Sequence, residues 1–184
     1  MKKLLISLFA ACFAVAQLPA QEPAFVKGNK VINLGVGLGS NLYRESYYNS
    51  TIPPVSASFE IGVKDHILER GVIGAGGYLA GSSYKYEFSR KGWKTTNFII
   101  GVRGNFHYPL VDKLDTYSGL MLGYGILRVE YFGGYDDDDY TGSSSGLQWA
   151  WFLGGRYYLR ETFAAMLELG YGISYLNLGV SFKF

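Results

Sequence analysis

The chain has 184 residues, of which 48% are hydrophobic and 17% are aromatic, and its formal net charge is only +2. The longest largely apolar run covers residues 4–16, which is too short for a membrane-spanning helix because such a helix needs ~20 residues. This composition excludes a helical membrane protein and argues against a nucleic-acid-binding protein.

The first twenty residues are typical of a secretory signal peptide. Lys2 and Lys3 precede the apolar run, and small residues follow it. Cleavage after Ala16 or after Ala20 fits the pattern, and we favour Ala20, which gives a signal peptide of residues 1–20 and a mature barrel domain of residues 21–184. Loss of the two lysines reduces the 17 basic residues to 15, equal to the 15 acidic residues, so the mature domain is formally neutral.

The single cysteine, Cys12, lies inside the predicted signal peptide. Ala10 and Ala11 before it resemble part of a lipoprotein attachment motif, but Phe9 stands where that motif usually has leucine, and apolar sequence continues beyond the cysteine. We therefore interpret Cys12 as an ordinary residue of the signal core. The mature domain then has no disulfide, no thiolate metal site and no cysteine nucleophile.

Eight segments after the signal peptide alternate between apolar and polar or small side chains, which is the pattern of a β-strand. Turn residues separate them, and weakly alternating segments of about ten residues are typical of membrane β-barrels. The predicted strands cover residues 32–38, 55–63, 72–80, 98–108, 117–126, 147–157, 163–171 and 175–184. The sequence therefore predicts an all-β fold, an eight-stranded antiparallel up-and-down transmembrane β-barrel.

Charged residues within these strands fall on the face opposite the apolar side chains. If the apolar residues face lipid, the interior receives Glu60, Arg103, Arg156, Glu168 and Lys183. An arginine or lysine that faced lipid near mid-membrane would cost ~2–4 kcal/mol. The interior of an eight-stranded barrel is just wide enough for side chains, so we expect the two glutamates to pair with the three basic residues. This lumen charge network predicts a plugged barrel, with a narrow gated pore as the alternative.

The predicted connections alternate in length. Residues 40–54, 81–96 and 130–146 form long loops, whereas residues 64–71, 109–115 and 160–162 form short turns. Outer-membrane barrels place short turns and both termini in the periplasm and long loops outside the cell. We therefore predict periplasmic N- and C-termini and three long extracellular loops.

The chain ends on a strand and an aromatic residue. Residues 176, 178, 180, 182 and 184 are Leu, Leu, Val, Phe and Phe, and the residues between them are Asn, Gly, Ser and Lys. This ending resembles the last strand of bacterial outer-membrane barrels, where a final aromatic residue is part of the signal read by the barrel-assembly machinery. We expect Phe182 and Phe184 to form this assembly signal.

The most specific part of this resemblance lies in residues 154–159, 167–179 and 181–184, and the whole resemblance covers nearly all of the mature domain. The chain resembles the small eight-stranded outer-membrane β-barrels typified by outer-membrane protein X and the membrane domain of outer-membrane protein A. Members of this group are structural, adhesive or of unknown role. The resemblance therefore implies a fold and a location in the outer membrane of a Gram-negative bacterium rather than an activity.

We expect no catalytic site and no cofactor. A lipid A-modifying barrel enzyme needs a histidine beside a serine at the lipid interface, whereas His66 falls in a predicted turn and His107 faces inward. The four residues Asp136 to Asp139 could hold a cation through carboxylate oxygens. However, a run of like charges usually marks a solvated loop, so cation binding by this run stays open and we predict no metal site.

Two non-enzymatic functions remain. We favour a structural or surface-interaction protein that is surrounded by outer-membrane lipid and whose loops contact lipopolysaccharide, host surfaces or other partners. The alternative is a soluble lipocalin-like carrier. A lipocalin would place its apolar face inward and would usually carry a disulfide and a C-terminal helix, and the mature sequence indicates neither.

Overall fold

The computed structural model describes residues 23–39, 49–88, 91–132 and 141–184. In these ranges, eight antiparallel strands pair in sequence order, and β1 pairs with β8 to close a barrel. The strands are β1 (Lys30–Leu38), β2 (Asn49–Ile67), β3 (Gly71–Phe88), β4 (Lys91–Val111), β5 (Leu114–Phe132), β6 (Thr141–Arg160), β7 (Phe163–Tyr171) and β8 (Leu176–Lys183). The predicted fold class is confirmed.

Two of the sequence predictions lie outside the described residues. One is the signal peptide of residues 1–20, with Cys12 and both cleavage sites, and the other is the acidic run from Asp136 to Asp139. Among the residues that are described, no helix is long and apolar enough to cross a membrane.

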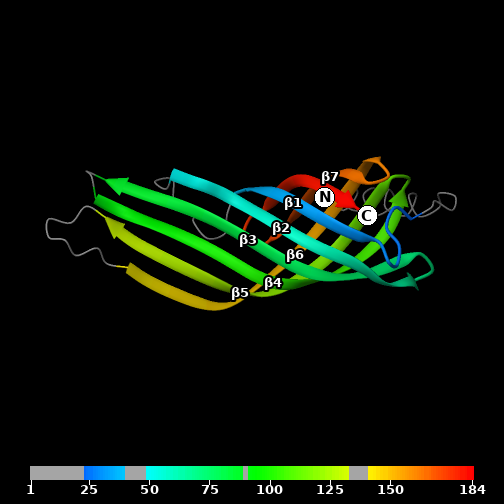
Figure 1. The fold of residues 1–184 in the computed structure, drawn as a ribbon, viewed down its shortest axis with the longest axis horizontal. Helices are drawn as coiled ribbons and strands as arrows, with labels where there is room; N and C mark the ends of the chain where they lie inside the picture. Colours follow the sequence, from blue (N-terminus) through cyan, green and yellow to red (C-terminus); the bar gives the residue numbers. More distant parts are fainter. Residues whose placement is uncertain (1–22, 40–48, 89–90, 133–140) are drawn as a thin grey trace, which may run out of the picture.

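The barrel has two different ends, which we call the base and the tip (Figure 1). At the base, β1 begins and β8 ends, and Lys30 and Phe184 exchange two backbone hydrogen bonds of 3.2 and 3.0 Å. The base turns are short and consist of residues 68–70, 112–113 and 161–162. At the tip, on the left in Figure 1, lie the end of β3, the beginning of β4, the end of β5 and the beginning of β6.

The outward face of the barrel is apolar, as predicted. Burial alternates along β1, with Ile32, Leu34 and Val36 exposed and the residues between them buried. The apolar surface continues around the ring, since Val102 on β4 is 64% exposed and Leu120 on β5 is 62% exposed. A transmembrane barrel presents a surface of this kind to lipid.

The predicted long loops at residues 81–96 and 130–146 are largely wrong, because the strands continue through the described parts of both segments. The end of the predicted loop at residues 40–54 is also wrong, because β2 begins at Asn49. Residues 40–48 and 133–140 of these predicted loops lie outside the described residues. β3 extends to Phe88, β4 begins at Lys91 and β6 begins at Thr141. The outer parts of these strands and of β5, residues 82–88, 91–97, 127–132 and 141–146, form what we call the tip sheet. It projects beyond the ends of β1, β7 and β8 (Figure 1).

The tip sheet was missed because our assignment required an apolar outward face. Ser83, Thr96, Arg128 and Ser143 are successive partners in the register and occupy the outward phase of the four strands, although Ser83 is buried. The alternation of a strand is present in this part of the sequence, but most of the outward side chains are polar. A search for lipid-facing strands therefore stops where the apolar band stops.

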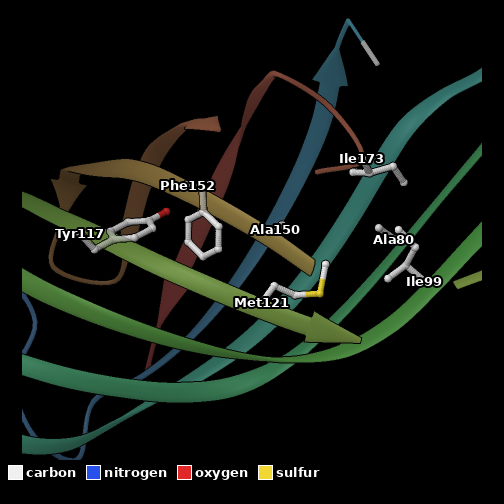
Figure 2. Close-up of a cluster of buried hydrophobic side chains, with 7 residues drawn as sticks. All are labelled: Ala80, Ile99, Tyr117, Met121, Ala150, Phe152 and Ile173. Atoms are coloured by element: carbon white, nitrogen blue, oxygen red, sulfur yellow. The ribbon is translucent and has the colours of Figure 1, made fainter. Parts of the chain in front are cut away.

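An apolar cluster occupies part of the barrel interior (Figure 2). It consists of Ala80, Ile99, Tyr117, Met121, Ala150, Phe152 and Ile173. Most of these residues lie on strands, whereas Ile173 belongs to the β7–β8 turn and is only 6% exposed. The turn therefore directs an apolar side chain back into the barrel.

Candidate functional site: the charged barrel interior

Four of the five residues predicted for the charge network are buried inside the barrel. Glu60 on β2 is 2% exposed, Arg103 on β4 is 6%, Arg156 on β6 is 0%, and Glu168 on β7 is 7%. The period-two alternation of each strand places these side chains opposite its apolar outward residues. They form two groups, which we call the base cluster and the central pair.

The base cluster consists of Glu60, His107, Asp115 and Arg156. The Nη1 atom of Arg156 donates to Oδ2 of Asp115 at 3.0 Å, and its Nη2 atom donates to Oε2 of Glu60. His107 lies between the same two carboxylates, with Nδ1 2.8 Å from Asp115 Oδ1 and Nε2 2.6 Å from Glu60 Oε1. The two basic side chains thus bridge the same two carboxylates and close a ring of contacts.

This ring sets the charge balance of the base cluster. A neutral imidazole can donate a hydrogen bond from only one of its nitrogens, although both nitrogens of His107 face carboxylate oxygens. With both nitrogens protonated, His107 and Arg156 together balance the charges of Glu60 and Asp115. Such pairing is needed because an unpaired buried charge is strongly unfavourable.

The central pair consists of Arg103 and Glu168. The Nη2 atom of Arg103 lies 2.5 Å from Glu168 Oε1, and the hydroxyl of Tyr117 donates to the same oxygen at 2.8 Å. The Arg103 guanidinium also lies 3.9 Å from the ring centroid of Phe152, within the range of a cation–π contact. On its other side, the Tyr117 ring is 4.5 Å from the Arg156 guanidinium, so Tyr117 connects the two groups.

Tyr117 fits between the two groups because the neighbouring position on β6 is a glycine. Gly154 pairs with Tyr117 in the register, and a Cβ atom built at Gly154 would overlap the tyrosine ring. A small residue on one strand thus makes room for a large one on the next.

A small cavity remains beside the central pair. Its volume is about 40 Å³, and its lining includes Arg103, Glu168 and Asn177. Two buried polar atoms, Nε of Arg103 and Oδ1 of Asn177, have no hydrogen-bond partner within the described part of the chain. The cavity lining is mostly apolar but contains these polar groups, and the volume is large enough to hold a water molecule.

The structure places Lys183 apart from the other predicted network residues. Its Nζ atom donates to the backbone carbonyl of Ala24 at 2.9 Å and lies 4.5 Å from the ring centroid of Tyr158. Lys183 has the inward phase that we predicted, but it is the last residue of β8 and therefore lies at the base rim. Its expected pairing with Glu60 or Glu168 is not present among the contacts of the described residues.

Sequence reasoning missed the roles of His107 and Asp115 in the base cluster. We expected residues 109–115 to form a turn, but the turn is only residues 112–113, and Asp115 lies on β5 opposite Pro109. A tight β4–β5 hairpin would have predicted this contact. Antiparallel pairing places the inward residues on either side of such a turn next to each other. Phe25, which stacks on His107, precedes the first predicted strand and gave no signal.

The two residues of the predicted assembly signal lie on the outside of the base. The Phe182 ring packs 5.4 Å from that of Phe163, and the Phe184 ring lies 6.5 Å from that of Phe59. Phe184 is 64% exposed. Both rings are therefore accessible from outside the barrel.

Neither histidine has the geometry of a general base beside a serine nucleophile. His107 is 1% exposed and contacts two carboxylates, and His66 lies near the base turn with Nδ1 3.2 Å from Asp65. In residues 23–39, 49–88, 91–132 and 141–184, no group of three or more His, Cys, Asp or Glu side chains is arranged to hold a metal ion.

Solved structures share this fold. Ail, the attachment invasion locus protein of Yersinia pestis, aligns with 86% of this chain and 100% of its own chain, at 15% identity and a TM-score of 0.53. The N-terminal β-barrel domain of OprF from Pseudomonas aeruginosa covers 86% of this chain and 98% of its own, at 16% identity and a TM-score of 0.46. Neither a family model nor a curated protein matches the sequence. The likeness to Ail shows the fold of a small outer-membrane β-barrel and carries no activity.

Proposed function

We propose that this chain, which has the fold of the small eight-stranded outer-membrane β-barrels, is an integral outer-membrane protein that contacts surface partners through its tip sheet. The tip sheet is the observation that carries this proposal. Lys85, Lys94 and Glu130 are neighbours in its register and occupy the outward phase, where the barrel below carries apolar residues. A charged outward face belongs in water, so the tip sheet projects beyond the lipid.

The inner face of the tip sheet supports a binding role. Tyr86, Trp93 and Tyr131 are register neighbours on β3, β4 and β5, and successive ring centroids are 5.8 and 5.7 Å apart. Trp93 is 45% exposed. Tryptophan and tyrosine are enriched among the residues that dominate binding interfaces, and an aromatic row on a projecting sheet suits a carbohydrate or protein surface. Lipopolysaccharide and host surfaces are the partners that we propose.

The proposal includes an orientation of the barrel. Short turns and both termini belong in the periplasm, and the longer elements belong outside. The base therefore faces the periplasm and the tip faces the exterior. The barrel-assembly machinery is the proposed partner of Phe182 and Phe184, and the exposure of both rings on the outside of the base supports this.

We also propose that the lumen is closed by its own side chains. The base cluster and the central pair join residues from β2, β4, β5, β6 and β7 across the interior, and a barrel of eight strands leaves room for little else. A charged interior and an apolar exterior are the reverse of a lipocalin-like carrier. In planar bilayers the protein should show no steady current, and reproducible single-channel currents would favour the gated pore instead.

Cysteine labelling on intact cells tests the location and orientation. Ser143→Cys places a thiol on the outward face of the tip sheet, and Glu161→Cys places one in a base turn, both at exposed positions. Each variant carries Cys12→Ser. A membrane-impermeant maleimide should label the tip thiol on intact cells and the base thiol only after permeabilisation. Labelling of the base thiol on intact cells, or recovery of the protein in the soluble periplasm, would contradict the proposal.

A tryptophan pair tests the binding role. Trp93 in the tip sheet and Trp151 on the lipid-facing side of β6 are both 45% exposed, so Trp151→Ala is a matched control for Trp93→Ala. Binding of the purified barrel in lipid to lipopolysaccharide, and adhesion of expressing cells to epithelial cells, should fall only with Trp93→Ala. No loss in either assay, or equal loss with both variants, would argue against recognition by the tip sheet.

A further inference from the structure

The opening of the barrel at the base contains a side chain that comes from outside the barrel wall. Phe25 precedes β1 and is only 2% exposed. Its ring stacks on the His107 ring at a centroid distance of 4.3 Å and lies 5.7 Å from the Arg156 guanidinium. Val31 and Val72, both buried, complete an apolar cluster around it. Phe25 therefore covers the base cluster on the side of the base opening.

The segment that carries Phe25 crosses the opening between two anchors. We call residues 24–29 the strap. At one end, the carbonyl of Ala24 accepts a hydrogen bond of 2.9 Å from Lys183 on β8. At the other end, the backbone N–H of Gly28 donates to the carbonyl of Gly62 on β2 at 2.9 Å, and the N–H of Gly62 donates to the carbonyl of Asn29 at 3.0 Å.

Two glycines allow the strap to sit in this position. Gly28 has a φ of +88°, a left-handed conformation that favours glycine. Gly62 faces the strap, and a Cβ atom there would overlap the carbonyl oxygen of Val26. The barrel wall is therefore shaped to receive the backbone of the strap as well as the Phe25 ring.

We propose that the strap is a movable stopper that controls access from the base to the charged interior. Phe25 is the only fully buried side chain of the strap, while Val26 and Lys27 are exposed. The hydrogen bonds that hold the strap lie outside the strand ladder, which begins at Lys30. The strap can therefore lift without breaking any strand pair, and lifting exposes His107 and its two carboxylates to solvent at the base.

This inference rests on the closed lumen under the proposed function and adds the element that closes one end. The β-barrel and the strap thus have separate stabilities. Segments that are held by few buried contacts open independently of the global unfolding of a protein. The strap meets this description because one aromatic ring supplies its buried apolar contact.

A buried thiol beneath Phe25 measures strap opening. Val72→Cys, in a Cys12→Ser background, places a small thiol against Phe25 at a position that is 2% exposed. The rate of its reaction with N-ethylmaleimide is measured on the protein folded in lipid vesicles. Adding Phe25→Ala should raise that rate by about ten- to a hundredfold, the effect of removing one buried phenylalanine from the closed state. Adding Val26→Ala, next to it on the exposed side of the strap, should leave the rate unchanged.

A second variant acts from the barrel wall and keeps Phe25. Gly62→Ala should displace the strap through the Val26 carbonyl and should also accelerate the labelling of Val72→Cys. Val31→Cys serves as a second probe if Val72→Cys lowers the yield of folded barrel. Slow labelling with both Phe25→Ala and Gly62→Ala, or fast labelling in the presence of the native strap, would overturn the stopper. Neither result depends on the labelling of Ser143→Cys on intact cells. Failure of the stopper proposal can therefore be distinguished from failure of the proposed surface function.

Discussion

The two ends of β4 and β5 carry opposite polarity on the same faces. In the barrel wall, β4 has Ile100 and Val102 outside and buried Arg103 inside, whereas in the tip sheet it has Lys94 on the outward phase and Trp93 on the inward phase. The alternation of the strand continues through both regions, and only the side that carries the apolar residues changes. In the barrel wall the outward side chains are apolar and the inward ones include buried charges, whereas in the tip sheet charged side chains occupy the outward phase and an aromatic row occupies the inward phase.

This difference separates two kinds of information in a strand sequence. Alternation with a period of two reports the backbone, because successive side chains point to opposite faces. The face that carries the apolar residues reports the solvent outside. If the tip sheet lies outside the membrane as we propose, each strand leaves the membrane without ending where its outward face changes from apolar to charged. A comparable substitution should therefore cost much more stability in the barrel wall than in the tip sheet.

The largest difference in stability loss is expected between the alanine variants of two arginines. Arg156 is 0% exposed and bridges two carboxylates, so Arg156→Ala leaves buried charges unpaired and should lower the free energy of unfolding by about 3–5 kcal/mol. Arg128 in the tip sheet pairs with Glu130, but its side chain is 62% exposed. Arg128→Ala should change stability by less than about 1 kcal/mol. Urea unfolding in lipid vesicles measures both, and similar losses would contradict a buried base cluster.

The next largest difference is expected between two positions on the outward face of β5. Leu122 is 53% exposed and lies in the apolar band, so Leu122→Arg should cost about 2–4 kcal/mol in the membrane. Glu130 has the same outward phase but lies in the tip sheet. Glu130→Arg should change stability by less than about 1 kcal/mol because it changes only an exposed pair. The same urea series checks both, and a Glu130→Arg variant as unstable as Leu122→Arg would place the tip sheet in lipid.

A smaller difference is expected between two inward glycines of β6. A methyl group at Gly154 would overlap the Tyr117 ring, so Gly154→Ala should destabilise the barrel by about 1–3 kcal/mol. A methyl group at Gly146, in the tip sheet, meets no atom within 4 Å. Gly146→Ala should therefore be neutral or slightly stabilising. Thermal unfolding followed on a gel distinguishes the two variants. An equal fall in their unfolding temperatures would mean that the interior is not packed as described.

The barrel wall was predictable from the sequence because lipid leaves few alternatives. The bounds of β7 were predicted as they are found, and the outward phase of β1 and β4 was correct. A membrane barrel requires an apolar outward face and allows charges only on its inward face. Each of these two patterns in the sequence therefore supports the strand assignment made from the other. The strands of the tip sheet lack that requirement, and their alternating Tyr84, Lys85, Tyr86 and Glu87 were therefore assigned to a loop.

The interior was only partly predictable, for a different reason. Alternation shows that Glu60 and Arg156 face inward, but it does not show at what height each lies in the barrel. Height depends on the register between neighbouring strands, and the tight turn at residues 112–113 sets the register that brings Asp115 to His107. Lys183 shows the same limit, because it faces inward as predicted but lies at the base rim, away from the two glutamates.

The smallest effect on stability is expected at the last residue. Phe184 is 64% exposed at the base, so Phe184→Ala should change the free energy of unfolding by only about 0.5 kcal/mol, as is usual for exposed positions. If Phe184 belongs to the signal read during assembly, the same variant should nevertheless reach the outer membrane in much lower yield. Phe132, a half-buried residue that ends β5 in the tip sheet on the outward phase, supplies a control at an internal strand. Quantitative immunoblots of membrane fractions should show a loss with Phe184→Ala and none with Phe132→Ala, because only Phe184 directly follows the terminal strand β8. Equal membrane yields of the two variants, with equal stabilities, would remove the assembly role from Phe184.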